Sequence, residues 1–129
     1  MLVHASIRTG NLERSVNFYT QFLGLKITKR IEIAQTNAEL VFLQDTELKG
    51  ATLELTFYRD QKRFVQAEYE DRLFDHLAFE VANMNETIGA MRNAGVTITD
   101  EPYRLSPNGN LLAFVEDPDG TLIELIEKA

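Results

Sequence analysis

Two histidines and two glutamates carry the chemistry that this sequence suggests. His4 and His76 each begin a short apolar run, and about fifty residues further on Glu54 and Glu124 each lie within an apolar run. A strand that buries the neighbouring leucines places such a glutamate on its opposite face, where a largely buried carboxylate needs a cation. One imidazole and one carboxylate from each half form a donor set suited to a divalent metal ion with open coordination positions.

The sequence contains one pattern twice. His4 and His76 lie 72 positions apart, and Glu54 and Glu124 lie 70 apart, a difference that small changes in turn length would produce. In each half the order is a strand, a helix and then three strands, which predicts an α+β fold of two βαβββ modules. Two such modules can lay their sheets side by side as a curved, cup-like mixed sheet into which matching side chains converge.

The elements that position these residues follow from apolar periodicity and turn residues. Asn11 and Asn83 are suited to cap helices, and Gly24 and Gly95 stand where the helices end. The charged stretch at 59–73 is predicted to be a connector within a single domain, 1–129, with module 1 at about 1–58 and module 2 at about 74–129. The predicted strands cover residues 2–8, 25–34, 38–44, 51–58, 75–81, 96–104, 111–116 and 121–127, with a tight Asp-Pro-Asp-Gly turn at 117–120.

Composition and charge narrow the classes of function. The 129 residues include no cysteine, which excludes disulfides, thiolate metal ligands and thiol nucleophiles. The net charge of −7 argues against a nucleic-acid surface, which requires clustered Lys and Arg. No apolar run approaches the ~18 to 20 residues of a membrane span, and the N-terminus lacks the pattern of a signal peptide, so we expect a cytoplasmic protein that contacts no membrane.

Motifs along nearly the whole chain resemble those of the vicinal oxygen chelate superfamily, and within it they are similar to the glyoxalase I family, also called lactoylglutathione lyases. The helix and the Asp-Pro-Asp-Gly turn are shared across the superfamily. The His, Glu, His, Glu set distinguishes this family from extradiol dioxygenases and fosfomycin-resistance proteins, which use two His and one Glu, and methylmalonyl-CoA epimerase differs at the position of Glu54. The resemblance rests on His4 with Arg8, Arg14-Ser15, Phe18-Tyr19, Leu23-Gly24, Leu53-Glu54-Leu55-Thr56, His76, and 113–120 leading to Glu124.

The resemblance implies a metal-dependent isomerase. Its substrate is the hemithioacetal of a thiol with a 2-oxoaldehyde such as methylglyoxal, and its product is a 2-hydroxyacyl thioester such as S-lactoylglutathione. The implied metal ligands are His4, Glu54, His76 and Glu124. Glu124 is the implied base, with Glu54 as its partner on the opposite face, and the reverse assignment stays open. Short chains of the family, which this one resembles in length, tend to be activated by nickel, so the resemblance implies nickel. Zinc, cobalt and manganese also suit this donor set.

Arg8 and Tyr58 are the predicted substrate-binding residues. Arg8 lies four residues after His4, on the same side of an extended strand, and the matching arginine of the family binds glutathione. Tyr58 stands where glyoxalase I commonly has an asparagine that contacts glutathione. Many bacterial members have a lysine near the position of Ser106, where this chain has only Arg104 close by. The co-substrate is therefore glutathione or another thiol.

Each residue also has an ordinary structural explanation. A histidine at the head of an apolar strand is commonly structural, Glu54 can lie on a solvated sheet face, and Arg8 can be a surface cation. Glu116 and Glu127 are predicted to be solvated. The rival functions are another enzyme of this fold, such as an epimerase, dioxygenase or thiol transferase, and a non-catalytic protein that binds a small ligand. Loss of any of the four ligands would have favoured the binding protein, and none is lost.

The resemblance also implies a homodimer with two shared active sites. In that arrangement His4 and Glu54 of one chain face His76 and Glu124 of its twin across a two-fold axis. The near-equivalence of the two halves leaves a site within one chain equally open, and a fifteen-residue connector can span either arrangement.

Overall fold

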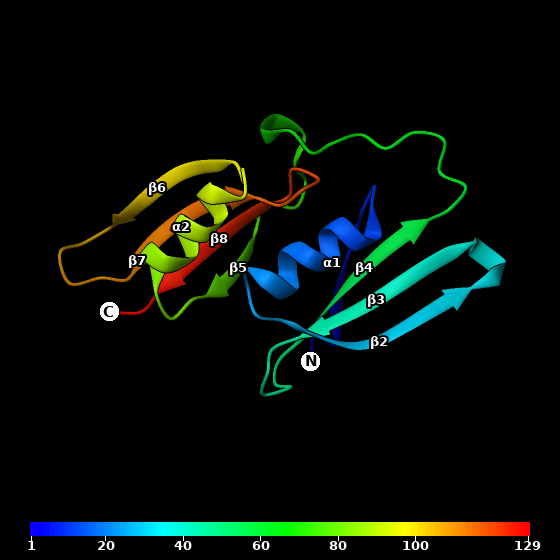
Figure 1. Ribbon diagram of the computed structural model, residues 1–129, viewed down its shortest axis with the longest axis horizontal. Helices are drawn as coiled ribbons and strands as arrows, with labels where there is room; N and C mark the ends of the chain where they lie inside the picture. Colours follow the sequence, from blue (N-terminus) through cyan, green and yellow to red (C-terminus); the bar gives the residue numbers. More distant parts are fainter. The chain divides into compact units, whose positions relative to one another are not determined.

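The chain forms two units, each with one sheet and one α-helix. The computed structural model describes residues 1–129, and its units are Met1–Val65 and Gln66–Ala129. Both have the order βαβββ, with the helix packed on one face of a four-stranded mixed sheet (Figure 1). The predicted α+β class and its two βαβββ modules are confirmed. The first unit contains β1 (His4–Arg8), α1 (Leu12–Gln21), β2 (Lys26–Ile33), a 3-10 turn (Ala34–Thr36), β3 (Ala38–Gln44) and β4 (Thr52–Tyr58).

The second unit repeats this order with shorter strands. His76 lies one residue before its first strand rather than inside it, because parallel pairing begins at Leu77, opposite Ile123. Neither helix of the chain is long and apolar enough to cross a membrane. The elements are a 3-10 turn (Tyr69–Asp71), β5 (Leu77–Glu80), α2 (Met84–Asn93), β6 (Ile98–Arg104), β7 (Leu111–Glu116) and β8 (Leu122–Glu127).

In each sheet the first strand lies beside the last one. The strand orders are β1-β4-β3-β2 and β5-β8-β7-β6, and the β1–β4 and β5–β8 pairs are parallel. Parallel neighbours need a crossover connection, which the helix and the two intervening strands supply. This topology sets the strand that begins at His4, and the strand that begins directly after His76, against the strand that carries the glutamate of the same unit.

The β4 strand separates the core from the face that carries the candidate site. Leu53 and Leu55 are 7% and 0% exposed, and they belong to the core that α1 covers with the fully buried Tyr19. Burying a leucine of this kind contributes roughly 1.5 to 3 kcal/mol. Glu54 and Thr56 alternate with the leucines and therefore lie on the opposite face, yet they are only 8% and 6% exposed.

The helix ends match the predicted signals. Asn11 Oδ1 accepts a hydrogen bond from the backbone N–H of Arg14 at 3.1 Å, and Asn83 caps α2 in the same way. Gly24 and Gly95 have φ values of 68° and 80°, which favour glycine where a helix ends.

Two glutamates that we predicted to be solvated have structural partners instead. Glu127 accepts a hydrogen bond from the backbone N–H of Met84, the first residue of α2, where the helix dipole favours a carboxylate. Glu116 Oε1 lies 3.4 Å from Nη2 of Arg72, whose side chain is 7% exposed. The prediction was wrong because both partners come from segments distant in sequence.

The stretch at 59–73 is irregular apart from its 3-10 turn, but it is packed. In the first unit Phe64 lies so close to Gly10 that an added Cβ there would come within 2.9 Å of the ring. In the second unit Arg72 donates to the carbonyl of Gly120 at 2.8 Å. The part of this segment that contains Phe64 thus packs within the first unit, and the part that contains Arg72 packs within the second.

Candidate active site

The first unit pairs His4 with Glu54. Nε2 of His4 lies 3.0 Å from Oε2 of Glu54. The pairing follows from the register of β1 and β4, in which Ser6 is opposite Glu54 and His4 lies two residues earlier on the same face. The glutamate side chain is 11% exposed and the histidine side chain 45%, so the pair joins a buried carboxylate to an accessible imidazole.

The second unit repeats this pair with His76 and Glu124. Their Nε2 and Oε2 atoms lie 3.1 Å apart, with side-chain exposures of 34% and 17%. The four predicted ligands are thus assembled as two pairs, one in each unit. Neither unit by itself holds a group of three or more His, Asp or Glu side chains that could bind a metal ion.

The geometry of each pair fits two ligands of one metal ion. Two donors at right angles, each about 2.1 Å from an ion, lie ~3.0 Å apart. The separations of 3.0 and 3.1 Å match this value. Imidazole nitrogen with carboxylate oxygen suits zinc, nickel, cobalt and manganese.

An aromatic ring packs edge-on against each histidine. The ring centroids of His4 and Phe42 are 6.1 Å apart at 87°, and those of His76 and Phe114 are 5.6 Å apart at 89°. Neither phenylalanine was predicted from the sequence to be a site residue, although the two are 72 positions apart, as the histidines are. The repeat thus extends to the rings that limit how each imidazole can turn.

Asp75 fixes the ring of His76. Its Oδ1 lies 2.7 Å from Nδ1 of the histidine. A neutral imidazole that donates from Nδ1 presents the lone pair of Nε2, which is the atom that faces Glu124. Asp75 was also missed, although its place next to His76 in the sequence was a usable signal.

Two hydroxyl groups support Glu54. Thr56 Oγ1 donates to Oε1 of Glu54 at 3.0 Å, and Ser6 Oγ lies 2.8 Å from Thr56 Oγ1. Neither residue was assigned a role in the site from the sequence, although Thr56 belongs to the motif that includes Glu54. Thr56 follows Glu54 by two positions and so shares its strand face, which was the available signal.

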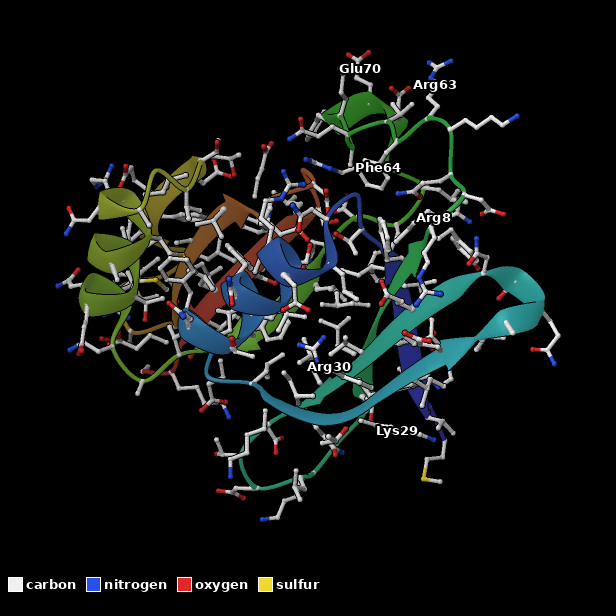
Figure 2. All side chains as sticks on the ribbon, turned by 45° about the vertical axis from the view of Figure 1, so that its right-hand side comes forward. Arg8, Lys29, Arg30, Arg63, Phe64 and Glu70 are labelled. Atoms are coloured by element: carbon white, nitrogen blue, oxygen red, sulfur yellow. The ribbon has the colours of Figure 1, made fainter.

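The predicted substrate-binding residues lie beside each other. The guanidinium carbon of Arg8 is 4.6 Å from the centre of the Tyr58 ring, a cation–π contact, and Arg8 is opposite Thr56 near the end of β4 (Figure 2). Arg8 has no carboxylate partner. Its guanidinium edge therefore stays available for an anionic ligand, on the same face as His4 and Glu54.

A second cation lies on this face. Nζ of Lys29 is 6.0 Å from the ring centroid of Phe42, whereas the next residue, Arg30, points to the other side of β2 (Figure 2). There Nη1 of Arg30 lies 2.7 Å from Oε1 of Glu13 in α1, and this hydrogen bond raises the pKa of Arg30. Lys29 was missed because its role depends on the pairing of β2 with β3.

A family model connects this geometry to known proteins. The model described as the Glyoxalase/Bleomycin resistance protein/Dioxygenase superfamily matches residues 1–125. The chain belongs to this superfamily. The resemblance seen in the sequence is thereby confirmed. Within the superfamily, the chain is 35% identical over 129 residues to the lactoylglutathione lyase of Escherichia coli O157:H7, in a match that covers 98% of this chain and 92% of that protein.

Solved structures of the same superfamily have the same fold. The trypanothione-dependent glyoxalase I of Leishmania major is 33% identical, with a TM-score of 0.79, and the match covers 98% of this chain and 86% of that one. Glyoxalase I from Zea mays is 25% identical with a TM-score of 0.82. The match covers 99% of this chain and 44% of the maize chain, so this chain spans less than half the length of that relative.

Proposed function

We propose that the protein is a metal-dependent isomerase of the glyoxalase I, or lactoylglutathione lyase, type. It converts the hemithioacetal of methylglyoxal and a thiol into a 2-hydroxyacyl thioester such as S-lactoylglutathione. The observation that carries this proposal is the His–Glu contact made twice, at 3.0 and 3.1 Å, in a chain 35% identical to a lactoylglutathione lyase.

The proposed metal ligands are His4, Glu54, His76 and Glu124. We favour nickel as the ion, with zinc, cobalt and manganese as the alternatives that suit the donor set. A bound divalent ion would supply Lewis-acid stabilisation of the negative charge that develops on the substrate oxygens.

The proposed proton carrier is Glu124. Its carboxylate takes the proton from C1 of the hemithioacetal, which leaves an enediolate, and then delivers that proton to C2. The hydroxyl proton on the C1 oxygen passes to the C2 oxygen, so the reaction is an isomerisation that needs no oxidant or reductant. Proton transfer by a positioned group of this kind contributes about 10²- to 10⁴-fold to the rate. Glu54 is the second carboxylate of the site.

Arg8 and Tyr58 are the proposed binding residues for the thiol. A guanidinium can hold a carboxylate through two parallel hydrogen bonds, and the ring of Tyr58 restricts its orientation. In a chain of net charge −7, a cation without a carboxylate partner is suited to an anionic co-substrate. Glutathione or another thiol with carboxylate groups fits this chemistry.

We further propose that the two units act as one functional domain in a cytoplasmic homodimer with two shared sites. An isologous dimer makes each contact twice and so yields two equivalent sites. The near-equivalence of the two His–Glu pairs supports an arrangement in which each shared site takes one pair from each chain.

Reconstitution of metal-free protein tests the proposed function. The protein is loaded in turn with Ni2+, Co2+, Mn2+ and Zn2+ and assayed for thioester formation with methylglyoxal and either glutathione or trypanothione. We expect turnover with at least one metal and one thiol, and none without metal. Thioester formation at the uncatalysed rate under every condition would contradict the proposal.

A further inference from the structure

A chain of two hydroxyls ends on Glu54 in the first unit. Thr56 Oγ1 donates to Glu54 Oε1 at 3.0 Å, and because a threonine hydroxyl has one hydrogen, Ser6 must be the donor in its 2.8 Å contact with Thr56. Glu54 and Thr56 are 8% and 6% exposed. Hydrogen bonds linked in series in such a setting strengthen one another. One oxygen of Glu54 is thereby held, while the other faces His4.

The second unit has the same backbone register without the hydroxyls. Ala78 is opposite Glu124 as Ser6 is opposite Glu54, and Ile126 follows Glu124 by two positions as Thr56 follows Glu54. Alkyl side chains donate no hydrogen bond. The only polar contact of Glu124 is the one with His76.

In the second unit the histidine is the supported member of the pair. Asp75 Oδ1 lies 2.7 Å from Nδ1 of His76, whereas His4 follows Val3 and has no such carboxylate. The first unit therefore restrains its glutamate and the second unit restrains its histidine. The two units thus share the His–Glu pair but differ in which member of the pair has a supporting hydrogen bond.

We propose that Ser6 and Thr56 are positioning residues that hold Glu54 as a fixed metal ligand, and that their replacement by Ala78 and Ile126 leaves Glu124 free to move. A carboxylate that carries a proton between two carbon atoms must leave its resting contact, and a hydrogen bond to one of its oxygens opposes that movement. The inference rests on the proposed isomerase function and assigns a physical cause to the different roles of two otherwise equivalent glutamates.

Removal of the hydroxyls tests the support of Glu54. Thr56→Val keeps the shape of the side chain and removes its donor, whereas Thr56→Ser keeps the donor. Titration of the metal-free protein with Co2+, followed by visible absorbance, should show an affinity about 10- to 100-fold lower for Thr56→Val and restored in Thr56→Ser. Thr20→Val is the matched control, because Thr20 donates within α1 to the carbonyl of Val16 and lies outside the site.

Ser6→Ala provides a second variant that does not alter the buried threonine. Its hydroxyl acts on Glu54 only through Thr56, so we expect a smaller loss of Co2+ affinity in the same direction. Circular dichroism and the Tm of each variant verify that it is folded. Co2+ affinity equal to that of the wild type in both folded variants would overturn the positioning role.

The reverse change adds hydroxyls beside Glu124. The Ala78→Ser/Ile126→Thr double variant should bind Co2+ at least as tightly as the wild type while its kcat falls with little change in KM, because a restrained Glu124 transfers the proton more slowly. A kcat equal to that of the wild type would overturn the proposed freedom of Glu124. The wild-type protein in the same assays separates a failure of this inference from a failure of the proposed function. Wild-type protein that isomerises the hemithioacetal would uphold the proposed function even if the variants contradict the inference. Wild-type protein that neither binds Co2+ nor turns over would overturn both the inference and the proposed function.

Discussion

Asp75 and His76 are adjacent in the chain and hydrogen-bonded through their side chains, with Oδ1 2.7 Å from Nδ1. This contact directs Nε2 of the histidine towards Glu124. We expect Asp75→Ala to lower metal affinity about 10- to 100-fold, because groups that orient a metal-binding histidine have effects of this size. Competition of the variant with a chelator for Ni2+ measures the change. Asp71→Ala, which alters an exposed aspartate of the 3-10 turn Tyr69–Asp71, is the control and should leave the affinity unchanged.

Removal of a ligand should remove the metal and leave the fold. His76→Ala and Glu54→Ala each delete one of four proposed ligands, and metal analysis after dialysis should show little bound ion. Circular dichroism should match the wild type, because both residues lie on the face opposite the core. Glu80→Ala is the control, since Glu80 is paired with Lys128 at 2.8 Å in an exposed position. Full metal retention in both ligand variants would contradict the proposed set.

The two glutamates should respond differently to replacement by glutamine. Glu124→Gln keeps an oxygen that can coordinate metal but loses the proton transfer, so its kcat should fall by about 10²- to 10⁴-fold. Rate and metal content have to be measured on the same sample. If Glu124→Gln keeps near wild-type activity, Glu124 is not the base and Glu54 becomes the candidate.

Changes at Arg8 should act on thiol binding. Arg8→Ala should raise KM for the glutathione hemithioacetal by about 10- to 100-fold, since a hydrogen bond to a charged group contributes ~1.5 to 3 kcal/mol. Tyr58→Phe keeps the ring under the guanidinium and should change KM little, whereas Tyr58→Leu should raise it. Arg30→Ala is the control, because Arg30 pairs with Glu13 on the other face of the sheet. An unchanged KM in Arg8→Ala would remove Arg8 from the site.

Mixing of two inactive variants tests the shared sites. After subunit exchange between His4→Ala and His76→Ala proteins, one site of each heterodimer would hold both substitutions and the other none, so activity should reappear. Native mass measurement monitors heterodimer formation. A mixture that contains heterodimers and stays inactive would mean that each site is built within one chain.

The sequence by itself determined the order of elements and the chemistry of the proposed ligands. Apolar alternation and capping residues predicted most strand and helix ends to within two residues. These signals act between neighbours in the chain, so they can be seen in the sequence. The repeat singled out His4, Glu54, His76 and Glu124, since two modules with one topology place equivalent positions at equivalent points of their sheets. The two His–Glu contacts follow from that topology.

The tertiary structure alone decided which side chains support these proposed ligands. The contact between Ser6 and Thr56 spans fifty positions and exists only because β1 pairs in parallel with β4 in one register. The role of Glu127 as a helix cap likewise depends on which strand end lies beside α2. Strand register is set by the hydrophobic pattern of whole strands and by turn geometry, so a side chain's local sequence carries little information about its distant partner. The register of each sheet therefore decides which side chains lie beside its glutamate: Ser6 and Thr56 beside Glu54, and Ala78 and Ile126 beside Glu124.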